Sequence, residues 1–197
     1  MKLPSFEAPA PDVAPQLLGC VLWAGSVGVR IVEVEAYEGA VDPASHAYSG
    51  RTARNGSMFG PGAHLYVYRM HGHACANIVC GPAGVARGVL IRAGEVVAGL
   101  DLARERRPGV KDAWLARGPG NLTRTLGISH ADDGAELLVG DEQRPGGLLQ
   151  LRPRCDQVSA VVASPRVNVP RAKKRAWRFT VSGSPAVSAP RPRPADG

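Results

Sequence analysis

The sequence predicts a single domain of the mixed α/β class, and three observations lead to this prediction. The chain has 197 residues, enough for one sizeable core, and no change in composition divides it into two. Apolar residues make up 44% of it, as in ordinary globular proteins. Several segments alternate apolar and polar residues with the period of a strand, while others carry apolar residues at helical spacing. We expect the folded domain over residues 11–184, between a flexible N-terminus (1–10) and a disordered Pro- and Arg-rich tail (185–197).

Three segments have the pattern of short helices at the periphery of such a domain. They cover residues 11–18, residues 95–106 and a short turn from about 119 to 126. Each has apolar residues three or four positions apart, and each is followed by a residue that stops helices, namely Gly19, Pro108 and Gly127.

The remaining apolar segments have the length and alternation of strands. They are expected at residues 20–23, 27–37, 65–70, 85–93, 137–139, 148–151, 159–164 and 177–181. Between the second and third of these, residues 38–62 form a Gly-, Ser- and Arg-rich connection longer than usual. Loops of that length in a compact domain tend to carry function.

The charge of the chain favours a polyanionic partner. Lys and Arg outnumber Asp and Glu by 24 to 17, which gives a net charge of +7 and a pI near 9.7. The surplus is almost all arginine, which forms forked contacts with phosphates, and it is densest in residues 166–178. Nucleic acid is therefore the first candidate, an anionic membrane surface is the second, and a solvated basic face is the alternative without function.

The chain has no run of 18 apolar residues and no secretory signal at its start. We therefore expect a soluble, cytoplasmic protein that does not bind membranes, associated with the nucleoid if the source is bacterial. Four scattered cysteines do not form a disulfide framework and are expected to be free thiols: Cys20, Cys75, Cys80 and Cys155.

Two glutamates and a tyrosine alternate along the strand at 27–37. With a period of two, Glu33, Glu35 and Tyr37 share one face with Val29 and Ile31. Acidic residues are uncommon in strands, so two interpretations stand side by side. The strand lies at an edge with its charges in solvent, or a carboxylate lies at a cleft and acts as a general base.

A metal site is a weaker hypothesis. His71, His73 and Cys75 alternate on one strand-like stretch and Cys80 follows, but no paired Cys-x-x-Cys and no zinc-deaminase signature accompany them. Nucleotide-binding glycine loops and the Gly-x-Ser-x-Gly elbow are also missing from the sequence. We therefore expect no metal and no cofactor.

Several motifs in order along the chain resemble those of the alkyladenine (3-methyladenine) DNA glycosylase family. The motifs are Ile31–Tyr37, Ser45-His46, Arg54–Phe59, Leu65–Tyr68, Val89–Ala93, Gly118–Leu122, Trp177–Phe179 and Gly183–Pro185. The resemblance covers about residues 11–188, nearly the whole predicted domain. It implies a curved, mostly antiparallel sheet with peripheral helices.

The resemblance also implies a reaction and roles for individual residues. A damaged purine leaves the duplex and is held between aromatic rings, Tyr37 and His46 on one side and Tyr68 on the other. Glu35 activates a water that Arg92 and the backbone carbonyl of Val167 position. The family is monofunctional, so the resemblance also implies release of the base without cleavage of the strand.

Two further roles concern the duplex itself. His71 corresponds to the side chain that fills the gap left by the flipped base, and Asn77 to the asparagine that opposes the 2-amino group of guanine. The segment 72–76 is shorter than is usual in the family, so the register between these two residues is for the structure to establish. Phosphate contacts are expected from Arg51, Arg54, Arg166, Arg171 and Arg178.

The implied partner is double-stranded DNA with damaged purines, bound by a monomer. Two other classes of protein remain open on the sequence. A damage-binding protein would keep the aromatic pocket without turnover, and a Cys/His nucleic-acid module would contain stoichiometric zinc.

Overall fold

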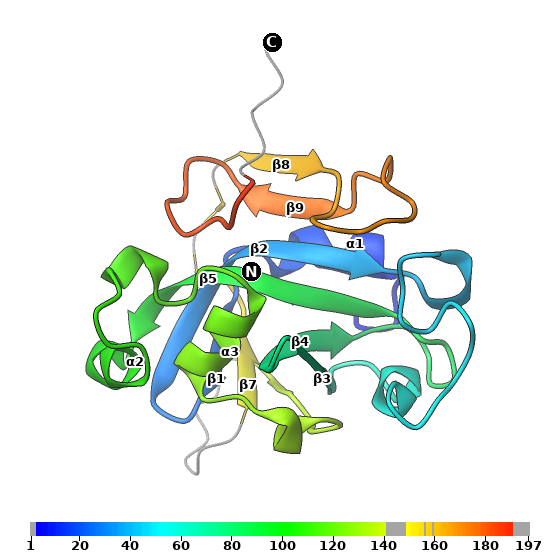
Figure 1. Ribbon diagram of the computed structural model, residues 1–197, viewed down its shortest axis with the longest axis horizontal. Helices are drawn as coiled ribbons and strands as arrows, with labels where there is room; N and C mark the ends of the chain where they lie inside the picture. Colours follow the sequence, from blue (N-terminus) through cyan, green and yellow to red (C-terminus); the bar gives the residue numbers. More distant parts are fainter. Residues whose placement is uncertain (1–2, 141–148, 156, 159, 191–197) are drawn as a thin grey trace.

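A computed structural model of the chain describes residues 3–140, 149–155, 157–158 and 160–190. Its centre is an antiparallel pair of long strands, β2 (Val27–Tyr37) and β5 (Gly88–Ala98), which cross the molecule side by side in Figure 1. Seven shorter strands complete the sheet: β1 (Val21–Ala24), β3 (Leu65–Met70), β4 (His73–Val79), β6 (Leu138–Val139), β7 (Leu149–Arg152), β8 (Val161–Ser164) and β9 (Arg178–Val181).

The sheet is curled and almost wholly antiparallel, as the resemblance implies. Its strand order is β3-β4-β5-β2-β1-β7-β6, with β9 on the second half of β2 and β8 beyond β9. Only β6 and β7, among the described strands, run parallel. The predicted class of a single mixed α/β domain with a curved sheet is confirmed.

Strand β2 changes its neighbour halfway along. Its first half pairs with β1, and Glu33–Glu35 pair with β9. The register against β5 shifts on either side of Glu33, which marks a β-bulge. Ile31 therefore shares the main core with Val34 and Ala36, and the predicted common face of Ile31 with the glutamates is wrong. After the bulge, Glu33 and Glu35 are both fully buried, so the edge-strand interpretation is wrong too.

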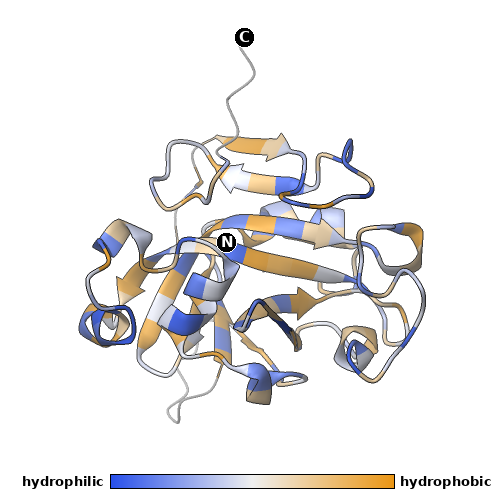
Figure 2. Ribbon diagram, in the orientation of Figure 1, coloured by the Kyte–Doolittle hydropathy of each residue, from blue (hydrophilic) through white to orange (hydrophobic). Residues whose placement is uncertain are grey.

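In the part of the chain that the structure describes, three helices lie against the sheet: α1 (Ala10–Leu17), α2 (Leu100–Arg106) and α3 (Pro119–Leu126). Short 3-10 turns cover Gly39–Val41, Gly56–Phe59, Asp112–Trp114 and His130–Asp132. Figure 2 shows the apolar residues concentrated on the central strands. The main core joins α1, the two long strands and α3 through side chains such as Leu17, Ile31, Ile91 and Leu122. No helix of the described residues is long and apolar enough to cross a membrane.

The prediction of a helix over residues 95–106 is half wrong. Residues 95–98 continue β5, because Val96 and Val97 are β-branched, and the helix begins only after Gly99. Gly99 has φ 68°, and a Cβ added to it would lie 2.5 Å from the Ser26 carbonyl oxygen, so a turn between strand and helix fits only glycine there.

Strand β4 was expected only as a strand-like stretch of histidine and cysteine. It is a full member of the sheet, paired with β3 on one side and β5 on the other. The predicted strand at 85–93 begins later, at Gly88. The alternation of β4 is hard to recognise in the sequence because this strand is rich in Ala, Cys and His rather than in the usual strand formers.

The fold extends at both ends beyond the predicted boundaries. The carbonyl of Phe6 accepts a hydrogen bond from the Gly81 N–H, and Leu3 and Phe6 pack against the core. At the other end, Ala186, Val187 and Ser188 are buried, although their setting among Pro and Ser predicted disorder. The predicted positions 1–2, 148, 159 and 191–197 lie outside the described residues.

Candidate active site

A cavity of about 530 Å³ opens where β2, β3, β4 and β5 meet the connection between β8 and β9. Nearly all the residues singled out by the resemblance line it or lie directly beneath it. Its walls are formed by Tyr37, Ala44, His46, Met58, Tyr66, Tyr68, Met70, His71, Asn77, Leu90, Arg92, Pro119 and residues 167–170. The cavity is aromatic on its sides and polar at its floor.

One wall is a cluster of three rings. His46 meets Tyr68 edge to face, with ring centroids 4.5 Å apart, and its Nδ1 lies 2.9 Å from the Tyr66 hydroxyl. The expected grouping of His46 with Tyr37 is therefore wrong, because the loop after β2 brings His46 over to β3. Burial and the nearby Arg54 charge lower the pKa of His46, while burial raises the pKa of Tyr66 to about 12. The wall is thus electrically neutral near pH 7.

Tyr37 lines the cavity from the end of β2. Its hydroxyl donates to Glu35 Oε2 at 2.8 Å, and its ring carries the Arg166 guanidinium at 4.5 Å from the centroid. Burial, and then the negative charge of Glu35, raise the pKa of Tyr37 well above its ordinary value. The phenol therefore stays protonated and serves as a hydrogen-bond donor to the carboxylate.

Three donors hold the Glu35 carboxylate beneath the cavity. Besides Tyr37, the Val167 N–H donates to Oε1 at 2.7 Å and Arg92 Nη1 donates to Oε2 at 3.3 Å. All three donors line the cavity, while Glu35 itself has no exposed surface. A carboxylate offers about four acceptor positions, so one remains for a water. Such an arrangement suits a carboxylate that accepts a proton at the floor of the cavity.

Glu33, two residues earlier, has a structural role, because its carboxylate accepts hydrogen bonds from residues that hold the fold together. It accepts hydrogen bonds from Arg92 Nε, from Arg178 Nε and from both the N–H and the hydroxyl of Ser188. Although burial alone would lower the pKa of Arg92, Glu35 and Glu33 together raise it. Arg92 is therefore a fixed cation that bridges the two carboxylates.

The hairpin of β3 and β4 turns within two residues. His71 has φ 50° and Gly72 has φ 81°, the positive pair that a tight type I′ turn requires. Met70 pairs with His73 across it, and His71 is exposed at the tip while also lining the cavity. Asn77 lines the same cavity, and its Nδ2 donates to the Tyr66 carbonyl at 3.1 Å.

The five arginines expected at DNA phosphates divide into two groups. Arg51, Arg54 and Arg171 are exposed. Arg166 and Arg178 are buried in ion pairs with Asp42 and Glu33, so their predicted phosphate contacts are wrong. An arginine inside a short basic segment looks exposed in sequence, and only the fold shows that its charge is already neutralised.

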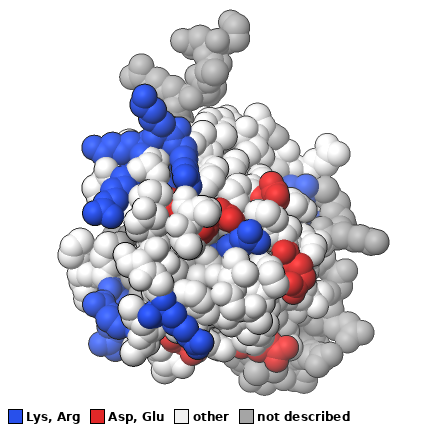
Figure 3. Space-filling model, turned by 90° about the vertical axis from the view of Figure 1, so that its right-hand side faces the viewer, with Lys and Arg blue, Asp and Glu red and all other residues white. Residues whose placement is uncertain are grey.

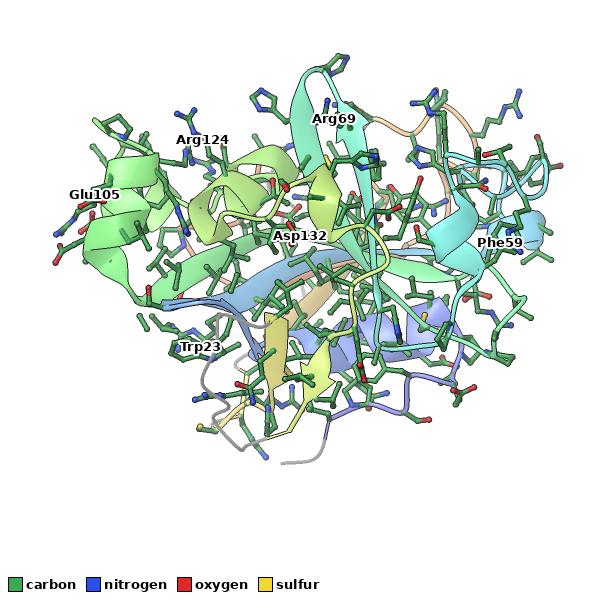
Figure 4. All side chains as sticks on the ribbon, turned by 90° about the horizontal axis from the view of Figure 1, so that it is seen from below. Trp23, Phe59, Arg69, Glu105, Arg124 and Asp132 are labelled. Carbon is green, nitrogen blue, oxygen red and sulfur yellow. The ribbon has the colours of Figure 1, made fainter. Side chains whose placement is uncertain are left out.

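On the face that Figure 3 shows, the exposed basic residues favour one side. Lys and Arg side chains gather along the left-hand side of Figure 3, and Asp and Glu lie nearer the middle and right. In Figure 4 the β3–β4 hairpin projects from the body, with Arg69 on its β3 strand and Arg124 along the same edge. Both are exposed. The hairpin tip therefore lies on a positively charged face.

Within the described residues, no group of three or more His, Cys, Asp or Glu side chains is placed to hold a metal ion. His71 and His73 lie at the hairpin tip, whereas Cys75 and Cys80 are buried in β4 and directly after it. The four cysteines are free thiols, as expected.

Three residues of the site were not singled out by the sequence. Tyr66 shares a strand face with Tyr68, and this alternation was a usable signal. Asp42 is an isolated acidic residue in a loop and gave none, although it binds Arg166. Ser188 lies in a segment whose composition predicted disorder, yet it binds Glu33.

An aromatic cavity over a buried carboxylate, on a positively charged face, is typical of enzymes that act on a single base of a nucleic acid. A family model described as Methylpurine-DNA glycosylase (MPG) matches residues 4–185. The chain therefore belongs to the methylpurine-DNA glycosylase family, and its membership makes it a DNA glycosylase that acts on DNA.

Bacterial relatives extend over almost the whole chain. A protein of Corynebacterium glutamicum is 45% identical over 191 residues, which is 96% of this chain and 97% of the relative. A protein of Cutibacterium acnes is 45% identical over 188 residues, 94% of this chain and 98% of the relative. A protein of Rhodococcus jostii is 48% identical over 190 residues, which is 93% of this chain and 82% of the relative. Each bears the name "Putative 3-methyladenine DNA glycosylase".

Proposed function

We propose that the chain excises alkylated and deaminated purines from duplex DNA by hydrolysis, with Glu35 as the general base. The substrate class comprises 3-methyladenine, 7-methylguanine, hypoxanthine and ethenoadenine. The observation that carries the proposal is the Glu35 carboxylate, held by Tyr37, Arg92 and Val167 directly beneath a cavity with aromatic walls.

The proposed step is a displacement at the deoxyribose. The oxygen of a water attacks C1′, the bond from C1′ to purine N9 breaks, and its electron pair leaves with the base. Glu35 takes the proton of the water, and its charge stabilises the oxocarbenium character of the sugar. An N-alkylated purine already carries a positive charge, so it departs without prior protonation.

The buried state of Glu35 bears on how the water reaches it. Of its three donors Arg92 is the most distant, at 3.3 Å. Catalytic hydrogen bonds in free enzymes often rearrange when substrate binds. Bound DNA is thus proposed to shift Arg92, so that it contacts the water together with the Val167 carbonyl.

The cavity walls suit a flipped purine. Tyr37 is proposed to cover one face of the base and the His46–Tyr68 pair the other, and electron-rich rings bind a cationic base better than a neutral one. Asn77 is proposed to exclude the 2-amino group of guanine. His71 at the hairpin tip is proposed to fill the gap in the duplex, while Arg51, Arg54 and Arg171 contact phosphates, with Arg69 and Arg124 in support.

No lysine is among the residues that line the cavity, so the described site offers no amine for a Schiff base with the sugar. The proposed enzyme is therefore monofunctional and leaves an abasic site in an intact strand. It works as a monomer without metal or cofactor.

The test is base release from duplexes that each carry one of the four lesions, with EDTA present. Abasic sites should form and should be cleaved only after alkali; a lesion-free duplex is the control. Release from none of the four duplexes would contradict the proposed function. Strand cleavage before alkali would contradict the monofunctional mechanism.

The Glu35→Gln variant tests the role of the carboxylate. The amide can keep part of the hydrogen bonding but cannot accept the proton, so the single-turnover rate should fall roughly 10²–10⁴-fold while lesion binding is kept. Glu95→Gln, on the far half of β5, is the matched control and should retain the wild-type rate. A normal rate for Glu35→Gln would exclude it as the base.

A further inference from the structure

The Asp42–Arg166 ion pair is the most deeply buried charge pair near the cavity. Both side chains have 0% exposure, and the guanidinium binds the carboxylate through two bonds, Nη1 to Oδ2 at 2.5 Å and Nη2 to Oδ1 at 2.8 Å. Burial alone would raise the pKa of Asp42, but the hydrogen bonds and charge of Arg166 lower it. Two apolar residues often stabilise a core as well as a buried charge pair does, or better. The presence of such a pair therefore calls for an explanation other than stability.

Arg166 joins three segments that are distant in sequence. Its Nη1 also donates to the Ala36 carbonyl at 2.8 Å, next to Tyr37 at the end of β2. Its planar group lies between the rings of Tyr37 and Trp177, at 4.5 and 5.2 Å from their centroids. The Ala36 N–H in turn donates to the Trp177 carbonyl. The Arg166 guanidinium therefore packs against the Tyr37 ring and fixes its position, because the guanidinium cannot move without breaking its ion pair with Asp42.

Arg166 also directly precedes Val167, whose N–H donates to Glu35. The connection from 166 to 175 contacts the loop that contains Asp42 at a second point, where Arg175 Nη2 donates to the Val41 carbonyl. Arg166 is therefore linked to two of the three donors to Glu35. It packs against the ring of Tyr37, whose hydroxyl is one donor, and it directly precedes Val167, whose N–H is another.

We propose that Asp42 and Arg166 form a positioning pair, which places Tyr37 and Val167 so that their donors meet the Glu35 carboxylate in the reactive orientation. This proposal rests on the proposed function of Glu35. The pair touches neither the base nor the water, and it acts only through the two donors. Lysine at 166 would keep the charge but not the fork, so it could hold Asp42 or Ala36 but not both.

The experiment measures single-turnover excision of hypoxanthine by Asp42→Asn, Arg166→Met and Arg166→Lys. We expect a rate loss of about 10–100-fold for the first two and a smaller loss for Arg166→Lys, with the dissociation constant of the lesion duplex changed less than about threefold. Leu151→Ala, which opens a hole in β7 away from the cavity, controls for lowered stability and should keep the wild-type rate of its folded fraction.

The decisive measurement repeats these substitutions in the Glu35→Gln background. If the pair acts through Glu35, they should change the residual rate there by less than about threefold, because the group they position is already lost. A full 10–100-fold loss in that background would overturn the proposal, as would an equal loss for Leu151→Ala. Should Asp42→Asn and Arg166→Met fail to fold, Asp42→Glu and Arg166→Lys provide the same comparison.

The two proposals fail in distinguishable ways. If the unmodified chain releases no lesion, the function and the positioning pair both fall. If it releases lesions and Glu35→Gln is slow, but the Asp42 and Arg166 variants keep the wild-type rate, only the positioning pair is overturned.

Discussion

Two glutamates of one strand face illustrate how neighbours decide the role of a residue. Glu33 receives four hydrogen bonds from Arg92, Arg178 and Ser188, which fill its acceptor positions. Glu35 receives three, all from groups that line the cavity. The first is therefore part of the internal framework, and the second keeps an acceptor position for chemistry.

His46 gives the site a predicted dependence on pH. Its pKa lies below the ordinary value of 6.5, because burial and Arg54 disfavour the charged ring, so the imidazole is neutral at pH 7. As the pH falls through this lowered pKa, the ring becomes positive and repels a cationic base. Excision of 7-methylguanine should therefore decline at acid pH more steeply than excision of neutral hypoxanthine.

The measurement is the ratio of the two single-turnover rates between pH 5 and 8, corrected for spontaneous depurination. A pH-dependent step that both lesions share cancels in the ratio. In His46→Gln the ratio should be flat over that range. A pH-dependent ratio that persists in His46→Gln would assign the effect to another group.

At the level of elements, the β3–β4 hairpin combines a conformational requirement with a proposed function. The turn needs positive φ at both His71 and Gly72, and His is among the residues that accept this conformation more readily than most. The same turn places the His71 side chain at the exposed tip of the positively charged face. Backbone and side chain of His71 therefore serve different purposes and can be separated.

Asn also tolerates positive φ, so His71→Asn should leave the melting temperature nearly unchanged while removing the imidazole that fills the duplex gap. We expect lesion binding to weaken roughly 10-fold, about 1.4 kcal/mol. His73→Asn, one residue beyond the turn, is the control. Binding by His71→Asn equal to that of wild type would exclude His71 as the wedge.

Gly72→Ala addresses the other half of the turn. At φ 81° no atom obstructs an added Cβ, so the cost is purely conformational, about 1–2 kcal/mol. The melting temperature should fall by roughly 2–8 °C. Gly72→Asn should lose clearly less, and an equal loss for both would show that the turn is not the type I′ form described.

For the molecule as a whole, the last described segment closes the fold over the buried charges. Ser188 binds Glu33 through its N–H and hydroxyl, and Arg178 donates to the carbonyls of Ser188 and Pro190. Two bonds to a charged acceptor contribute about 3–6 kcal/mol together. The segment therefore links the stability of the domain to the placement of Arg92.

A chain ending after Pro185 lacks Ser188 and its two hydrogen bonds to Glu33, so its free energy of unfolding should be several kcal/mol lower. In a protein of this size, its melting temperature should then lie roughly 6–20 °C below that of the full chain. A chain ending after Pro190 keeps all of these contacts and should melt well above the chain that ends after Pro185. Thermal unfolding followed by circular dichroism decides between them. Equal melting of the two shortened chains would show that residues 186–190 contribute little.

Much of the fold could be predicted because it depends on local pattern. The strand at 65–70 and the strand at 27–37 have the predicted bounds, since their alternation is strong and turn residues flank them. Strand β4 and the end of β5 were misjudged because their composition is ambiguous and pairing with neighbouring strands decides such cases. The resemblance likewise predicted a site that contains Tyr37, Arg92 and Val167, and all three line the cavity.

The sequence by itself determined the family, the fold class and the residues around Glu35, because motifs and periodicity are local properties. Only the tertiary structure decided which charges are free. Arg54 and Arg166 look equivalent in sequence, yet one is exposed and the other is buried against Asp42, 124 positions away. The physical reason is that burial and ion pairing depend on which distant segments fold together, and no local pattern contains that information.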